Sequence, residues 1–174
     1  MRALVVYESM YGNTLNVATA IADGIRKTME VETVEVSAAP PVLPADVTLL
    51  VVGAPTHVHG MSTAKSRTNA AERAGGPVIS RGVGMREWLA ALKPDTGLVA
   101  AAFDTRSGGP MLLTGSAAKG EVQLLKKAGL RRIEQPHSFV LDGTTGPLEN
   151  RVASDELDAA RAWGATLAGV AANA

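Results

Sequence analysis

The residue types best suited to chemistry lie in a turn near the start of the chain, residues 9–14, with the sequence Ser-Met-Tyr-Gly-Asn-Thr. An apolar run over residues 3–7 predicts a buried strand before the turn, and apolar residues at helical spacing over residues 13–25 predict a helix after it. Such a turn directs backbone N–H groups toward one place, where the positive end of the helix dipole also lies. With side-chain donors added by Ser9, Asn13 and Thr14, the turn predicts a phosphate site.

The kind of phosphate follows from what this turn lacks. A Walker A loop needs G-x-x-x-x-G-K-[ST], and no lysine is present here. A dinucleotide fingerprint needs three glycines, and the turn contains only Gly12. A single terminal phosphate fits better. The alternative is a capped turn whose hydroxyl groups satisfy only the first N–H groups of the helix.

Two further polar segments follow apolar runs that predict buried strands. Residues 54–62 follow the run at 47–53, and residues 104–110 follow the run at 98–103. Ligands of doubly wound sheets bind at the carboxyl ends of the strands, so we expect these loops to lie beside the first turn. His57 and His59 could share a face and ligate a metal, but no third ligand has suitable spacing, and we predict no metal site.

The elements that must position these loops alternate between strand and helix patterns. We expect the remaining strands at residues 31–36 and at residues 130–141, the latter broken near Pro136 because proline cannot donate to a ladder. Further helices are expected at residues 85–92, 115–128 and 153–172. This order predicts an α/β fold, a three-layer doubly wound sandwich with a five-stranded parallel sheet, in one domain covering residues 1–174.

Two connections have no clear pattern of their own. Residues 63–84 are polar and glycine-rich, and connections of this length without regular structure are uncommon and often functional or mobile. The sequence leaves the role of this connection open. Residues 142–148 form a second connection, rich in turn-forming residues.

Composition excludes several classes of function. The chain has no cysteine, which excludes disulfides, thiol nucleophiles and protein-ligated iron–sulfur clusters. Seventeen basic and seventeen acidic residues cancel, so we expect no nucleic-acid partner. No signal-peptide pattern opens the sequence and no apolar run is long enough to span a bilayer, so we expect a cytoplasmic protein without membrane insertion.

Two motifs resemble those of the flavodoxin family. The first is Ser-x-x-Gly-Asn-Thr directly after the first strand, and the second is Gly-x-Pro-Thr at residues 53–56 after the central strand. The resemblance extends over nearly the whole chain. It implies a flavodoxin-like fold that binds FMN through three loops, and it implies cofactor contacts from Ser9, Met10, Tyr11, Gly12, Asn13, Thr14, Pro55, Thr56, His57, Val58, His59, Gly60, Phe103, Asp104, Thr105 and Arg106.

The sequence also departs from the family pattern. Flavodoxins are usually acidic and commonly enclose the flavin ring between aromatic side chains, whereas this chain is neutral and only 3% aromatic. The resemblance implies that Gly60 permits a peptide rearrangement next to the flavin, since glycine tolerates both conformers. It also places Arg106 near the flavin N1 edge, where a cation stabilises the reduced anion. The alternative for Arg106 is a surface ion pair with Asp104 or another loop acid.

Three functions therefore remain open. The resemblance favours an FMN-binding electron-transfer protein that acts with redox partner proteins or a small-molecule electron acceptor and has no catalytic residues of its own. An FMN-dependent NAD(P)H:quinone-type reductase is a second possibility. A third is a regulatory or interaction domain with the same fold that has lost FMN, because fold does not determine function. The sequence does not indicate an oligomeric state.

Overall fold

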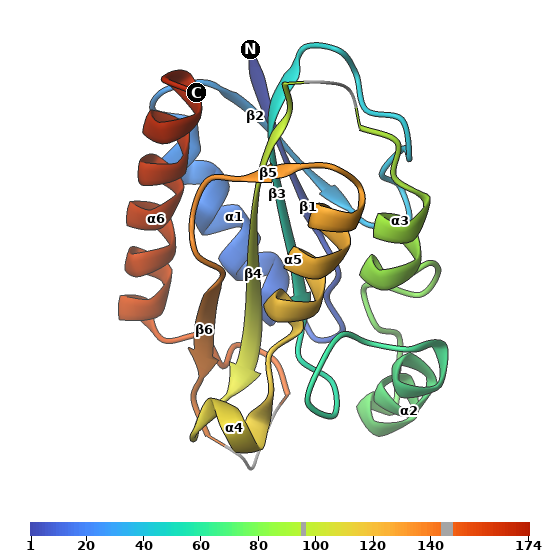
Figure 1. Ribbon diagram of the computed structural model, residues 1–174. Coiled ribbons are helices and arrows are strands. Elements are labelled where there is room, and N and C mark those ends of the chain that lie inside the picture. The colour runs from blue at the N-terminus through green and yellow to red at the C-terminus, as the bar shows by residue number, and fades with distance from the viewer. Residues whose placement is uncertain (95–96, 144–147) are drawn as a thin grey trace.

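The computed structural model of the protein describes residues 1–94, 97–143 and 148–174. Its centre is one parallel sheet, shown in Figure 1, in the order β2-β1-β3-β4 with β5 and β6 both beside β4. The strands are β1 (Arg2–Tyr7), β2 (Glu30–Glu35), β3 (Val47–Pro55), β4 (Val99–Ser107), β5 (Arg131–Arg132) and β6 (His137–Leu141). The predicted α/β class with a parallel sheet is confirmed.

The most apolar runs form the middle of the sheet. In β1 and β3, Tyr7 pairs with Gly53, and in β3 and β4, Gly53 pairs with Phe103, so the three strands end at the same edge. The strand β2, with the sequence Glu-Val-Glu-Thr-Val-Glu, pairs with β1 at the border of the sheet. The sheet order therefore places the three predicted loops together at the carboxyl ends of β1, β3 and β4.

The fifth position in the sheet is shared by two short strands. β5 pairs with Val99 and Ala100 at the start of β4, and β6 pairs with residues 103–107 at its end. This confirms the predicted interruption near Pro136. The pairing with β6 also extends β4 to Ser107, four residues beyond the predicted end of that strand.

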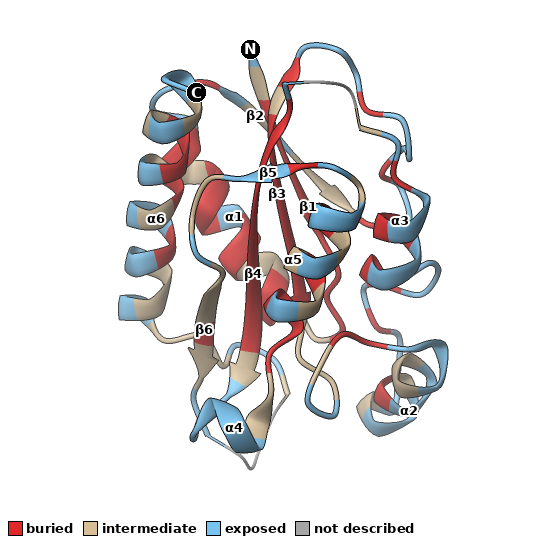
Figure 2. Ribbon diagram, in the orientation of Figure 1, coloured by how far each residue is buried: buried red, intermediate tan, exposed pale blue. Residues whose placement is uncertain are grey.

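Helices cover both faces of the sheet (Figure 1). The helices α1 (Asn13–Ile25) and α6 (Ser154–Ala172) lie on one face, and α3 (Met85–Ala91) and α5 (Ala117–Lys127) lie on the other. Alternate strand residues face the two layers, and Figure 2 shows the sheet interior buried between them. The helices α1 and α6 approach closely at Gly24 and Gly164, where an added Cβ would overlap the backbone of the opposite helix.

Two helices were not predicted. The connection at residues 63–84 contains α2 (Ala64–Ala74), and α4 (Met111–Thr114) forms a single turn after β4. The side chain of only one α2 residue, Ala70, is buried, so the sequence of this helix lacks the apolar stripe by which helices are recognised. Part of the predicted connection at residues 142–148, residues 144–147, falls outside the described residues. None of the helices in the described ranges has the length and hydropathy needed to cross a bilayer.

Candidate functional site

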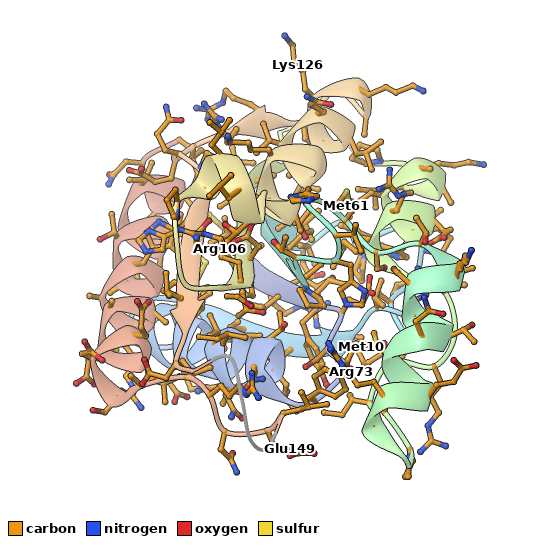
Figure 3. All side chains as sticks on the ribbon, turned by 90° about the horizontal axis from the view of Figure 1, so that it is seen from below. Met10, Met61, Arg73, Arg106, Lys126 and Glu149 are labelled. Atoms are coloured by element: carbon orange, nitrogen blue, oxygen red, sulfur yellow. The ribbon has the colours of Figure 1, made fainter. Side chains whose placement is uncertain are left out.

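A cavity of about 380 Å³ opens at the carboxyl edge of the sheet, where β1, β3 and β4 end. Figure 3 views the molecule from this side. The volume of the cavity falls within the range of small-molecule sites, which is roughly 300–1,000 Å³. The cavity is lined by Ser9, Met10, Tyr11, Asn13, Thr14, Pro55, Thr56, His57, Val58, Ser66, Asn69, Ala70, Arg73, Thr105, Arg106, Ser107, Leu141, Leu148 and Arg151.

The first loop ends in a geometry suited to an anion. Gly12 has a φ of 90°, in the left-handed region, and the Ser9 hydroxyl oxygen accepts hydrogen bonds from the N–H groups of Gly12 at 3.2 Å and Leu15 at 3.4 Å. The neighbouring backbone N–H groups have no acceptor among the described residues; these are the N–H groups of Met10, Tyr11, Asn13 and Thr14. Free N–H groups at the start of a helix favour a bound anion.

This loop is fixed by segments far away in the sequence. Ser9 and Ser80 exchange two hydrogen bonds: the Ser9 N–H donates to the Ser80 hydroxyl at 2.9 Å, and the Ser80 N–H donates to the Ser9 carbonyl at 2.8 Å. The Ile79 N–H donates to the Met10 carbonyl at 3.1 Å. These contacts use the Ser9 N–H and the carbonyl groups of Ser9 and Met10, and they leave the N–H groups of Met10 and Tyr11 without a partner among the described residues. The contacting residues are far apart in the chain, so the sequence alone does not predict these contacts.

Asn13 joins the first loop to the segment before α6. Its side-chain amide donates to the Leu148 carbonyl at 2.8 Å, and its side-chain oxygen accepts from the Arg151 N–H at 2.9 Å. Both side-chain groups are therefore used to hold a neighbouring loop. Leu148 and Arg151 thereby become cavity residues, which the sequence did not predict.

The second loop contains a strained turn. His57 and Gly60 exchange backbone hydrogen bonds of 2.8 and 3.0 Å, and the two residues between them, Val58 and His59, have φ angles of 42° and 74°. Positive φ is unfavourable for residues other than glycine and most of all for a β-branched one such as Val58. The left-handed residues are thus Val58 and His59, and Gly60 does not adopt positive φ.

The two histidines of this loop lie in different surroundings. His57 lines the cavity, and its Nδ1 lies 3.1 Å from the Ser66 hydroxyl of α2. Burial, and secondarily the charge of Arg67, lowers the pKa of His57, so its ring is neutral at pH 7. His59 is exposed, lies outside the cavity lining and passes close to Gly115, where a Cβ would overlap the His59 backbone. No group of three potential metal ligands occurs in the described parts of the chain.

The third loop divides its residues between the cavity and the core. Thr105 is buried and lines the cavity, where its hydroxyl lies 2.8 Å from the hydroxyl of Thr14. Phe103 is fully buried, and its ring occupies the place that a side chain at position 53 would need. Five of the residues that were predicted to contact the cofactor do not line the cavity: Gly12, His59, Gly60, Phe103 and Asp104.

Asp104 and Arg106 point to different partners. One carboxylate oxygen of Asp104 accepts from the Ser116 hydroxyl at 2.5 Å and the Ala118 N–H at 3.0 Å, so Asp104 caps the start of α5. The Arg106 guanidinium donates to the Gly109 carbonyl at 2.9 Å and the Thr114 hydroxyl at 3.1 Å. Among the described residues it makes no ion pair, which is a correction to the surface-ion-pair alternative, and it remains at the cavity wall.

Three buried carboxyl groups lie beneath the second loop, toward α3 and α5. Glu8 accepts from the Met85 N–H at 2.7 Å, and burial is the main cause of its raised pKa. Glu121 is fully buried, and neither of its oxygens has a partner among the described atoms. Burial first, and then the charges of Asp104 and Glu8, raises the pKa of Glu121 well above its ordinary value. Burial and the neighbouring negative charges therefore favour the neutral form of Glu121.

The unpredicted helix α2 forms part of the cavity lining. Ser66, Asn69, Ala70 and Arg73 are spaced at three and four residues, so they share one face of the helix. The Tyr11 hydroxyl donates to the Ala70 carbonyl at 3.0 Å and joins this helix to the first loop. The spacing of the serine, asparagine and arginine is visible in the sequence. It indicates a shared polar face only once this segment is known to be a helix.

Residues 5–80 match the family model for flavodoxin. No curated protein matches the chain by sequence. A flavodoxin from the domain Archaea is 20% identical, with a TM-score of 0.66 over 99% of each chain.

Two further solved structures have the same fold. A short-chain flavodoxin associated with a non-canonical PDU bacterial microcompartment is 20% identical, with a TM-score of 0.63 over 98% of this chain and 99% of that one. The Flv1 flavodiiron core from Synechocystis sp. PCC6803 is 15% identical, with a TM-score of 0.63 over 99% of this chain and 36% of that one. Residues 5–80 thus match the flavodoxin family model, and nearly the whole chain shares the fold of the archaeal and short-chain flavodoxins.

Proposed function

We propose that the protein binds FMN in the cavity at the carboxyl edge of the sheet and acts as an electron-transfer protein. The observation that carries this proposal is the first loop, where four backbone N–H groups without partners among the described residues belong to residues that line the cavity. Such a group of donors suits a terminal phosphate. In this proposal, residues 1–174 form one domain built around this site.

The residues present fit a flavin phosphate at more than one place. The Ser9 hydroxyl already accepts from Gly12 and Leu15, so its own proton is available for a phosphate oxygen. Pro55, Val58 and Leu141 supply apolar surface to the same cavity, and Thr56, Thr105 and Arg106 supply polar groups. Cofactor sites likewise combine apolar surface with polar groups that orient the ligand. FMN, when bound, would accept and release the electrons.

The chain's own residues would orient the cofactor and influence its affinity for electrons. The hydroxyl contact between Thr14 and Thr105 fixes the first and third loops relative to each other. His57, which is neutral at pH 7, would offer hydrogen bonding without charge. Arg106 would offer a positive charge at the wall. The proposed partners are redox proteins or a small-molecule electron acceptor.

Titration with FMN and with riboflavin tests the proposal. FMN should bind at least about tenfold more tightly than riboflavin, because charge-assisted hydrogen bonds to a phosphate contribute about 1.5–3 kcal/mol each. Thr14→Ala should weaken FMN and leave riboflavin nearly unchanged. The FMN complex should also be reduced reversibly, and its visible absorbance would monitor the reduction. Equal affinities for the two ligands, or no binding of either, would contradict the proposal.

A further inference from the structure

The helix α2 carries a cation at the cavity that the proposed function does not use. Arg73 lies in the last turn of α2 and lines the cavity together with the first loop. Within the described residues it has neither a hydrogen-bond partner nor an ion-pair partner. A guanidinium is well suited to a phosphate, since it offers several donors in a planar arrangement.

Several contacts fix α2 in place against the loops of the cavity. Arg67 of α2 forms an ion pair of 3.2 Å with Glu87 of α3 and donates to the Ser62 hydroxyl at 2.9 Å. Thr63 and Ser66 form a reciprocal cap at the start of the helix, and the Ser66 hydroxyl also meets His57. At its middle the helix is bonded to Tyr11. The position of Arg73 therefore follows from a helix that is bonded to the first and second loops and to α3.

Arg73 also lies close enough to the first loop to affect it electrostatically. Burial raises the pKa of the Tyr11 phenol, the charge of Arg73 lowers that pKa, and the charge of Glu149 raises it. Figure 3 shows Arg73 beside Met10, the residue before Tyr11, and both line the cavity. The guanidinium thus stands next to the loop whose free N–H groups suit an anion.

We propose that Arg73 is a specificity-determining residue. From its position on α2, its positive charge recognises the negatively charged phosphate that the first loop also holds. This inference rests on the proposed function and adds a charged contact supplied by a separate helix. The N–H groups of the loop provide dipoles, whereas Arg73 provides a full charge. Recognition of the phosphate therefore depends on ionic strength, because a partly exposed charge is screened by salt.

The experiment measures dissociation constants of FMN and riboflavin for the full-length apoprotein and three variants. Arg73→Gln removes the charge, Arg73→Lys keeps it, and Lys65→Gln removes the same charge from an exposed position on α2 outside the cavity lining. At about 0.1 M salt, where screening acts over about 10 Å, Arg73→Gln should weaken FMN binding by about threefold to tenfold. Near 1 M salt the difference should fall below about twofold.

The remaining arms separate charge recognition from a structural effect. Riboflavin affinity should be unchanged in Arg73→Gln, Arg73→Lys should retain most of the FMN affinity, and Lys65→Gln should behave as the wild type. Equal losses for FMN and riboflavin, or equal effects of Arg73→Gln and Lys65→Gln, would overturn the inference. If the wild type binds FMN more tightly than riboflavin while Arg73→Gln changes nothing, the inference fails and the proposed function stands. If the wild type does not distinguish the two ligands, both fail.

Discussion

The hydroxyl groups of Thr14 and Thr105 lie 2.8 Å apart, and both side chains are buried at the cavity. Thr14 is the second residue of α1 and Thr105 lies near the end of β4, so this single contact joins two segments that are separated by 91 positions in the chain. One hydroxyl donates and the other accepts. The proposed phosphate loop and the third loop are thereby held in one arrangement.

A double-mutant cycle tests this contact. Thr14→Val and Thr105→Val should each destabilise the apoprotein by about 1–3 kcal/mol, since each leaves a buried hydroxyl without a partner. The double variant should be less destabilised than the sum of the two, with a coupling of about 0.5–1.5 kcal/mol. Urea denaturation of the four proteins measures these values. Strict additivity would show that the two hydroxyl groups are not coupled.

The turn at Val58 and His59 predicts a gain in stability on substitution. Val58 is 86% exposed and has a φ of 42°, so its side chain contributes strain and little packing. Val58→Asn should raise the free energy of unfolding by about 0.5–1.5 kcal/mol, because asparagine tolerates the left-handed region. Val83→Asn is the matched control, an exposed valine without positive φ. A gain at position 83 as large as that at position 58 would rule out strain as its source.

Arg106 predicts a change in the potential of a bound flavin. A positive charge at the cavity wall should stabilise a negatively charged reduced flavin. Arg106→Gln should therefore lower the midpoint potential by about 15–30 mV, where about 30 mV corresponds to tenfold for a two-electron couple. Spectroelectrochemical titration measures this shift.

Two controls separate the charge of Arg106 from its contacts. Arg106→Lys keeps the charge and should retain most of the wild-type potential, although it loses part of the bonding to Gly109 and Thr114. Arg131→Gln removes a charge from β5, which pairs with the opposite end of β4, and should have no effect. If Arg106→Gln and Arg106→Lys shift the potential equally, the loop contacts and not the charge are responsible.

Glu121 predicts how stability depends on pH. Its pKa in the folded protein is raised well above 4.5, mainly by burial. Between the unfolded and the folded pKa, the folded protein holds a proton that the unfolded chain has released, so stability falls as pH rises through this window. One titrating group can change the free energy of unfolding by at most about 1.4 kcal/mol per pH unit. The raised pKa of Glu8 acts in the same direction.

Glu121→Gln should remove much of this dependence. The variant's free energy of unfolding should increase relative to that of the wild type as pH rises from about 5 to 8, because glutamine has no proton to lose. Urea denaturation at several pH values measures the trend. Glu72→Gln, at an exposed position on α2, is the matched control and should parallel the wild type. Parallel curves for Glu121→Gln and the wild type would mean that Glu121 is already ionised in the folded protein.

The sequence by itself determined the sheet and the place of the site. Continuous apolar runs predict β1, β3 and β4 because strands buried on both faces need apolar residues at every position, and the helices α1, α3, α5 and α6 follow from apolar residues at helical spacing. These signals depend on neighbours along the chain. The order of strands and helices then requires the three loops to meet at one edge, where the cavity is found.

Only the tertiary structure decided which residues of those loops line the cavity and which other segments join them. Asp104 turns toward α5 and Thr105 toward the cavity because successive residues of a strand face opposite sides of the sheet. Pairing with β6 continues β4 through Arg106, which also lines the cavity. The helix α2 is held by polar contacts with Tyr11 and Glu87 and by a small apolar cluster that its alanines form with Met10 and Val78, and alanine leaves little apolar pattern in the sequence. Arg73 reaches the cavity for this reason alone: contacts between residues far apart in the chain place its helix there.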